Sequence, residues 1–142
     1  MRREGACPCR AVRYAIDGPV RDVLVCHCNA CREATGGPWA ASATYRRDLV
    51  VDDEMALTWE PAVVSEHGAS RGHCHICGTT VFWDAPGRET VSFGVGTLAD
   101  ASGLEVAGHI WVSEDAGLTV LPAGVPAYSR GLPPSVAVPW RA

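Results

Sequence analysis

The 142-residue sequence lacks three features that would point to nucleic acid, to a membrane or to secretion. Its formal net charge is -4 and it has no run of lysine or arginine, whereas a nucleic-acid-binding surface normally shows a basic stripe. No window approaches the roughly 18 apolar residues of a transmembrane helix. The N-terminal run MRREGACPC has no apolar stretch behind its arginines, so it does not read as a signal peptide. These absences predict a cytoplasmic protein without nucleic-acid or membrane partners.

The composition is that of one folded, turn-rich domain. The chain is 47% hydrophobic and 20% charged, which is typical of a globular protein and not of a disordered one. Its length suits a single hydrophobic core. The 15 glycines and 10 prolines favour short strands joined by turns over a bundle of helices. We therefore expect a mainly β fold.

Segments with strand-forming residues recur between turn signals. We expect strands over residues 11–16, 23–25, 39–45, 49–51, 56–59, 63–64, 79–83, 90–95 and 109–112. One short helix is predicted over residues 29–35. Asn29 is its expected N-cap, and Gly36 and Gly37 are expected to end it.

The end of the chain is rich in proline. Five prolines after Leu121 predict an irregular tail, because proline lacks the backbone donor that a regular element needs. The expected organisation is therefore one domain over residues 1–120, with a Pro-rich C-terminal segment, residues 121–142, packing on the same domain.

Seven cysteines fall into three tight clusters. The clusters are Cys7-Pro-Cys9, Cys26-His-Cys28-Asn-Ala-Cys31 and Cys74-His-Ile-Cys77. In a reducing compartment, clustered cysteines indicate metal ligands or catalytic thiols in preference to disulfides, and an odd number would leave one thiol over. Tetrahedral zinc takes cysteine sulfurs at about 2.3 Å, often as closely spaced pairs from separate segments. The pattern therefore predicts zinc binding, with two ions per chain.

The first and last clusters together predict a closed metal site. Cys7 and Cys9 form one pair, and Cys74 and Cys77 form the other in a Cys-x-x-Cys-Gly turn. Gly78 permits the positive φ of such a turn. Two pairs from distant segments are typical of a structural zinc site. The alternative is a set of buried cysteines without metal.

The middle cluster predicts an open metal site. Cys26, Cys28 and Cys31 lie at a strand-to-helix turn, where three thiolates can take three corners of a tetrahedron. Catalytic zinc sites keep the fourth position for water or substrate. Cys31 falls in the first helical turn, where the helix dipole favours a thiolate. The alternative is a second structural zinc completed by a histidine, and the candidates are His27, His73, His75 and His109.

Three segments carry the cysteines in a specific context. They are Gly5-Ala-Cys7-Pro-Cys9, Cys26-His-Cys28-Asn-Ala-Cys31-Arg-Glu-Ala-Thr-Gly36 and Arg71-Gly-His-Cys74-His-Ile-Cys77-Gly-Thr79. These segments resemble the patterns Gly-x-Cys-x-Cys, Cys-His-Cys-x-x-Cys-Arg-x-x-Thr-Gly and Arg-x-Phe-Cys-x-x-Cys-Gly-Thr of the glutathione-dependent formaldehyde-activating enzyme family. Similar Gly-Thr-Leu and His-Ile-aromatic-Val elements occur at residues 96–98 and 109–112. The likeness covers roughly residues 5 to 115.

The resemblance implies a zinc-stapled β-tent fold and an enzyme of the carbon-sulfur lyase type. The implied activity joins glutathione, or a related small thiol, to formaldehyde or another small aldehyde. The implied structural zinc is held by Cys7, Cys9, Cys74 and Cys77. The implied active-site zinc is held by Cys26, Cys28 and Cys31.

Three positions depart from the family pattern. Arg10 stands where a glycine is common, and His73 stands where an aromatic residue is common. After Val112 the chain continues Ser-Glu-Asp, whereas many members carry a Lys-x-x-Trp-like ending. These departures bear on the identity of the substrate and not on the metals.

Four residues beside the open site are further candidates for the chemistry. His27 is flanked by two ligands, so we expect it to point away from the ion and to orient the ligands, to shuttle a proton or to lie on the surface. Arg32 is a candidate for binding a carboxylate of an acidic thiol, and the alternative is a solvated arginine on the helix surface. Thr35 and Gly36 are expected near the open position, in contact with the thiol.

A second function stays open at this level. The β-tent fold also serves in interaction domains, so the alternative is a non-catalytic zinc-stapled module that binds a thiol or a protein. The sequence does not decide the oligomeric state.

Overall fold

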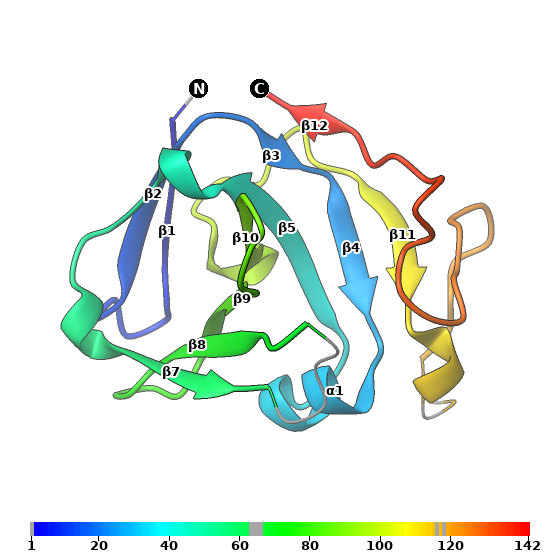
Figure 1. The fold of residues 1–142 in the computed structure, drawn as a ribbon, viewed down its shortest axis with the longest axis horizontal. Helices are drawn as coiled ribbons and strands as arrows, with labels where there is room; N and C mark the ends of the chain where they lie inside the picture. The colour runs from blue at the N-terminus through cyan, green and yellow to red at the C-terminus, as the bar shows by residue number, and fades with distance from the viewer. Residues whose placement is uncertain (1, 63–66, 116, 118) are drawn as a thin grey trace.

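The computed structural model describes residues 2–62, 67–115, 117 and 119–142, and this part of the chain is mainly β with one short α-helix (Figure 1). One sheet has the strand order β1-β2-β6, and a larger sheet follows the path β11-β4-β5-β10-β9-β8-β7, with β3 and β12 beside it. The predicted mainly β fold with one short helix is confirmed. No helix among the described residues is long and apolar enough to cross a bilayer.

The elements follow one another with short connections. The strands are β1 (Arg2–Ala6), β2 (Arg13–Asp17), β3 (Val20–Arg21), β4 (Val23–Cys26), β5 (Trp39–Tyr45), β6 (Leu49–Val51), β7 (Leu57–Pro61), β8 (Ser70–Cys74), β9 (Thr80–Asp84), β10 (Thr90–Gly94), β11 (Val106–Ile110) and β12 (Trp140–Arg141). The helices are α1 (Asn29–Thr35) and the short 3-10 helices η1 (Arg46–Asp48), η2 (Glu54–Ala56), η3 (Val95–Thr97) and η4 (Val112–Glu114). All neighbouring strands pair antiparallel except β11 and β4, which are parallel.

The hydrophobic core joins the two sheets through the ring of Tyr14 in β2. This ring lies 5.2 Å from the ring of Phe82 and 5.9 Å from the ring of Phe93, measured between centroids. Its hydroxyl forms a 2.7 Å hydrogen bond with the hydroxyl of Thr97. Gly5 of β1 lies opposite Tyr14, and a Cβ atom at Gly5 would overlap the tyrosine ring. The first strand therefore needs a glycine where it crosses this ring.

Helix α1 has the predicted bounds but a different N-cap. The capping residue is Cys28, whose Sγ accepts a hydrogen bond from the backbone N–H of Cys31 at 3.3 Å. Asn29, the predicted cap, is the first helical residue instead, because the cysteine sulfur takes the place of the expected side-chain oxygen. Gly36 ends the helix as predicted, with a φ of 83°, and its N–H donates to the carbonyl of Arg32.

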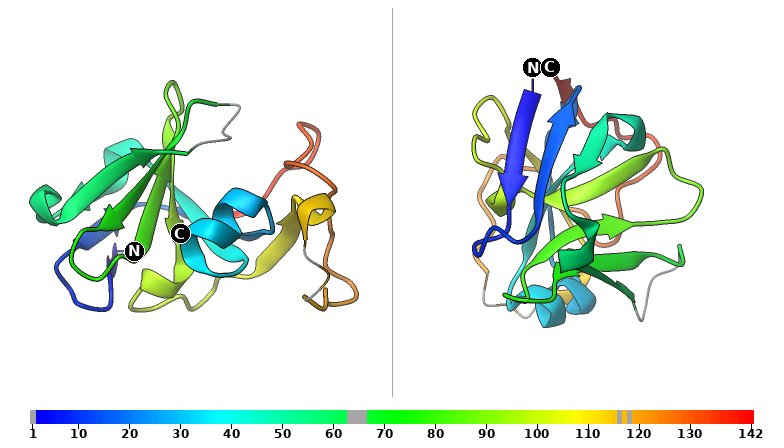
Figure 2. Two further views of the ribbon diagram at one scale, coloured as in Figure 1. Left: turned by 90° about the horizontal axis from the view of Figure 1, so that it is seen from below. Right: turned by 90° about the vertical axis from the view of Figure 1, so that its left-hand side faces the viewer.

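The C-terminal segment runs beside β11 and returns to the top of the large sheet (Figures 1 and 2). The N–H of Tyr128 donates to the carbonyl of His109 at 2.8 Å, and Ala127 forms a parallel bridge with His109. The segment ends in β12, which pairs with β3. There Arg141 donates two hydrogen bonds, of 3.0 and 2.6 Å, to the buried carboxylate of Asp22. The prediction of an irregular tail is therefore confirmed for most of the segment, but it is wrong for β12.

Most predicted strands are confirmed, with three kinds of exception. β1, β3, β8 and β12 were not predicted, because they are short or interrupted by glycine and so give weak signals. The strand predicted over residues 109–112 is wrong at its end, since Trp111 has a φ of 57° and η4 follows it. The strand predicted over residues 63–64 lies outside the described residues.

Candidate metal centres

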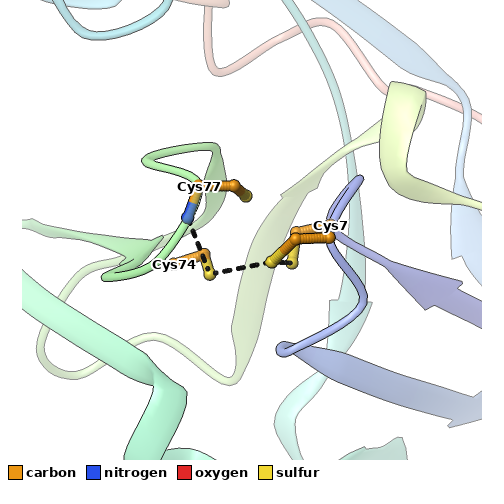
Figure 3. Close-up of side chains that lie close together, drawn as sticks. Cys7, Cys74 and Cys77 are labelled. Atoms are coloured by element: carbon orange, nitrogen blue, oxygen red, sulfur yellow. Dashed lines mark hydrogen bonds between the residues drawn. The ribbon is translucent and has the colours of Figure 1, made fainter.

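The four-cysteine cluster lies where the loop after β1 meets the end of β8 and the turn that follows it (Figure 3). The Sγ of Cys9 lies 3.6 Å from the Sγ of Cys7 and 3.6 Å from the Sγ of Cys74. The Sγ of Cys77 completes a set of sulfurs that all lie within 4.8 Å of one another. Cys7 and Cys74 are buried, and the other two are exposed. The cluster thus connects the small sheet to the large one.

The spacing of these sulfurs fits a tetrahedral zinc ion. Zinc–sulfur bonds of about 2.3 Å place neighbouring sulfurs about 3.8 Å apart, close to the observed separations. A disulfide needs about 2.05 Å, so none of the cysteines is bridged. Backbone N–H groups of Ile76 and Cys77 point at the Sγ of Cys74, at 3.4 and 3.5 Å. These donors favour a thiolate, and they lower the pKa of Cys74.

The three-cysteine cluster forms where β4 runs into α1. Cys26 ends the strand, Cys28 caps the helix and Cys31 lies in its first turn, with all three sulfurs within 4.8 Å of one another. Thiol hydrogen bonds from Cys26 and then Cys31 hold the pKa of Cys28 far below its usual value. The same hydrogen bond with Cys28 raises the pKa of Cys26, because the Cys26 thiol is the donor and keeps its proton. The pKa of Cys31 is raised as well, so Cys28 is the thiol of this cluster that ionises most readily.

No fourth ligand joins this cluster from the described part of the chain. The metal-ligating groups within 4.8 Å are the three cysteines alone, so none of the four histidines considered as a fourth ligand is among them. The donor set fits a metal ion with one coordination position left open. This arrangement can present a water molecule or a substrate sulfur to the ion.

His27 points away from the three sulfurs into the protein. Its side chain is fully buried, its Nε2 lies 2.9 Å from Nδ1 of His109, and its Nδ1 lies 3.0 Å from Oδ1 of Asp115. The surface alternative is thereby excluded. An ionised carboxylate only accepts hydrogen bonds, so His27 donates to Asp115 through Nδ1. A neutral His27 then accepts at Nε2 from His109, whose own Nε2 is buried without a partner in the structure.

The turn after β11 places the side chain of Glu114 beside the cysteine loop. Trp111 adopts left-handed backbone geometry, which is uncommon for a bulky residue, and η4 follows it. In η4, the side chain of Glu114 accepts a hydrogen bond from the backbone N–H of Asn29 at 2.9 Å. Arg32 donates to the carbonyl of Glu114 at 2.9 Å and to the side chain of Asn29. Arg32 is therefore not a freely solvated arginine.

Thr35 and Gly36 lie at the far end of α1. The Thr35 hydroxyl lies within hydrogen-bonding distance of the carbonyls of Cys31 and Gly37, at 2.8 and 2.7 Å. Thr35 also lines an open groove of about 480 Å³, together with Trp39 and the loop of Cys77. No atom beyond its chain neighbours lies within 4 Å of a Cβ placed on Gly36. Contact of these two residues with a thiol stays a prediction.

Comparison with known proteins places this site in a family. The model of the glutathione-dependent formaldehyde-activating enzyme family matches residues 2–114, a span that includes both cysteine clusters. The chain belongs to this family. A comparison with curated proteins finds no match. Among solved structures, a crystal structure of a Rhodobacter sphaeroides protein is 19% identical, with a TM-score of 0.53, and covers 88% of this chain and 98% of its own. That likeness supports the fold alone.

Two residues of this glutathione-dependent formaldehyde-activating enzyme family member had no role in the sequence prediction. Asp115 follows directly after the matched span, and 88 residues separate it from His27. Arg71 was quoted only as part of a motif, yet its Nη2 lies 3.4 Å from the Sγ of Cys31, 40 residues away. Neither contact leaves a local pattern, so only the folded chain identifies them.

Proposed function

We propose that this protein joins a small thiol, with glutathione as the first candidate, to formaldehyde or another small aldehyde. The observation that carries the proposal is the cluster of Cys26, Cys28 and Cys31, which leaves a ligand position open among the described residues. Membership of the glutathione-dependent formaldehyde-activating enzyme family supports the choice of thiol and aldehyde. We also propose a cytoplasmic location, without nucleic-acid partners.

The reaction we propose is the addition of a thiol across a carbonyl, a carbon-sulfur lyase reaction in reverse. The thiol sulfur forms a bond to the carbonyl carbon, the π electrons of the carbonyl move to its oxygen, and the thiol proton ends on that oxygen. A zinc ion at the open site would supply the positive charge that favours the thiolate and polarises the carbonyl.

Each candidate residue near the open site has a proposed part in this reaction. The three cysteines hold the metal, and His27, fixed from behind by His109 and Asp115, orients the ligand loop. Arg32 is a candidate for binding a carboxylate group of the thiol substrate. Its Nη2 already donates to Asn29 and Glu114, so we propose that Nη1 makes this contact. Thr35 and Gly36 are proposed to line the path of the thiol.

We propose that a second zinc ion has a structural role. Its ligands are Cys7, Cys9, Cys74 and Cys77. Two of these cysteines are buried, and the two pairs come from segments that are far apart in the sequence. Both features favour a closed site that holds the two sheets together.

The proposal is tested with the zinc-loaded protein and two cysteine variants. We expect glutathione to bind in calorimetry, and we expect the protein to accelerate adduct formation with labelled formaldehyde above the uncatalysed rate, measured by exchange NMR. Cys28→Ser should stay folded and lose thiol binding, because the serine removes one of three ligands. Cys77→Ser, at the other cluster, should lower the stability and leave thiol binding of the folded fraction intact.

Two results would change the conclusion. Glutathione binding without any acceleration would favour a thiol-binding module. A wild-type protein that holds two zinc ions and binds no thiol would refute the proposed function.

A further inference from the structure

Arg71 reaches from β8 to the three-cysteine cluster. Its Nη2 lies 3.4 Å from the Sγ of Cys31, which is hydrogen-bonding distance for sulfur. Its guanidinium carbon lies 5.9 Å from the ring centroid of Trp39, over the indole face. Two contacts from different elements thus hold this cation beside the sulfurs.

Within the described part of the chain, the charge of Arg71 has no carboxylate partner. Among the residues that the structure describes, none of the ion pairs within 4.0 Å includes Arg71. Its neighbours across the strands are Glu60 in β7 and Trp83 in β9, and Glu60 is exposed. The Nη1 atom is buried and has no hydrogen-bond acceptor in the structure. A half-buried cation without a counter-ion is costly unless the cysteine cluster itself carries negative charge.

The charge of the loaded cluster explains why a cation is needed here. A divalent ion with three thiolates has a net charge of minus one, and an anionic fourth ligand would make it minus two. Two like charges separated by a few ångströms repel by several kcal/mol at an effective dielectric constant of about 20. A fixed positive charge at the same distance offsets that repulsion. A neutral fourth ligand meets no such repulsion.

We propose that Arg71 is the counter-charge that allows the three-cysteine centre to accept an anionic fourth ligand, and that it thereby selects anionic over neutral ligands. The inference rests on the proposed function only in placing a metal ion at this cluster. Arg71 is a specificity-determining residue in this account, acting through the charge of the centre and through its N–H···S contact with Cys31.

The test compares anionic and neutral probes on the cobalt-loaded protein, where visible absorption reports the fourth ligand. The probes are azide and glutathione as anions and imidazole as the neutral ligand. In Arg71→Met we expect the affinity for azide and glutathione to fall roughly tenfold or more, and the affinity for imidazole to change less than about threefold. Arg71→Lys should restore most of the anion affinity, because it keeps the charge.

Two further variants separate charge from packing. Arg71→Gln keeps a hydrogen-bond donor near Cys31 but removes the charge, so it should behave like Arg71→Met toward the probes. Arg88→Met removes an arginine that also lies over a tryptophan, 5.2 Å from the Trp83 centroid, and it should leave all three affinities unchanged. The cobalt content of each variant is measured first, and the affinities are compared per loaded site.

The outcomes are distinct from those for the proposed function. Equal losses for azide and imidazole, or no loss for azide, would overturn the role of Arg71, as would a wild-type centre that accepts none of the probes. Azide binding that depends on Arg71, in a protein that does not bind glutathione, would support the inference and refute the proposed function.

Discussion

The Nε2 atom of His27 lies 2.9 Å from the Nδ1 atom of His109, although 82 residues separate the two histidines. His27 follows the last residue of β4, and His109 belongs to β11, the parallel neighbour of that strand. With Asp115 on its other nitrogen, the imidazole of His27 is held at both ends inside the protein. The loop that carries Cys26 and Cys28 is therefore anchored from behind by a buried ring.

Removal of the Asp115 side chain should loosen the three-cysteine cluster. In Asp115→Ala the Nδ1 of His27 loses its acceptor, so the ring and the adjoining ligands lose their fixed orientation. We expect the metal affinity of this cluster to fall about tenfold, measured by competition with a chelator. Asp52→Ala, which removes an exposed carboxylate 4.0 Å from Arg13, is the control and should have no effect. Equal affinities in the two variants would show that the anchor is unnecessary.

Metal removal should proceed in two steps. A chelator should empty the three-ligand cluster first and leave the protein folded, because Cys26, Cys28 and Cys31 lie in one short segment and do not join distant parts of the chain. The four-cysteine cluster, with Cys7 and Cys74 buried, should release its ion later and together with unfolding, since structural zinc contributes on the order of 10 kcal/mol. Zinc release and circular dichroism recorded on the same sample test this order. Unfolding that accompanies the first ion would contradict it.

The fit of Gly5 against Tyr14 predicts a costly substitution. In Gly5→Ala the added methyl group overlaps the buried tyrosine ring, so β1 or the ring must shift. We expect the free energy of unfolding to fall by about 1–3 kcal/mol, as for other overpacked cores. Gly37→Ala is the matched control, because no atom beyond the chain neighbours lies within 4 Å of its added carbon. Denaturant unfolding of the metal-loaded proteins measures both, and similar values would refute the packing argument.

Local signals predicted the parts of the fold that depend on neighbours in sequence. The cysteine spacing separated the two clusters, and Asn29 to Gly36 gave the bounds of α1, because caps and metal ligands act within a few residues. The cap itself was assigned one residue late, because a cysteine is not a common capping residue. The grouping of sulfurs could thus be predicted before any tertiary contact was known.

Long-range contacts and unusual backbone geometry could not be predicted in this way. The partners of His27 lie in β11 and just after η4, and Arg71 meets Cys31 only because β8 folds toward α1. Trp111 belongs to a run with strong strand propensity, yet its positive φ ends the strand and starts η4. Such features arise from the packing of distant segments, which a single sequence does not encode as a pattern.

An unpartnered hydroxyl in β5 predicts a stabilising substitution. The Oγ1 atom of Thr44 is buried and has no hydrogen-bond partner in the structure. Thr44→Val keeps the shape and removes the unsatisfied group, so we expect the free energy of unfolding to rise by about 1 kcal/mol. Ser42→Ala in the same strand removes a hydroxyl that donates to the carbonyl of Arg21, and it should destabilise by about 1–3 kcal/mol. Thermal unfolding compares the pair, and a loss of stability in Thr44→Val would be the contrary result.

The ion pair between Arg141 and Asp22 should contribute stability across neutral pH. Asp22 is 2% exposed, and its hydrogen bonds from Arg141 hold its pKa below the usual value. A depressed pKa means that the contribution is complete above about pH 4 and is lost as the pH falls through the lower folded value. Arg141→Met should therefore cost about 2 kcal/mol, less than for a fully buried pair because Arg141 is partly exposed.

The pH range gives this prediction a second check. The difference in unfolding free energy between wild type and Arg141→Met should be the same at about pH 6.5 and pH 8, since Asp22 stays ionised at both. Arg2→Met, which breaks an exposed pair with Glu4 at 3.5 Å, should change the stability by less than about 0.5 kcal/mol. A difference that varies between the two pH values would point to another titrating group.

The position of the C-terminal segment also sets an order of assembly during synthesis. All ligands of the four-cysteine cluster have left the ribosome once Cys77 has emerged, so the junction of the two sheets can form early. The surroundings of His27 need β11, Asp115 and the residues near Tyr128 that pair with His109. Strand β3 pairs with β5 and gains its second partner strand, β12, only from Trp140–Arg141. In the nascent protein the four-cysteine cluster would thus be complete first, and the surroundings of the three-cysteine cluster last.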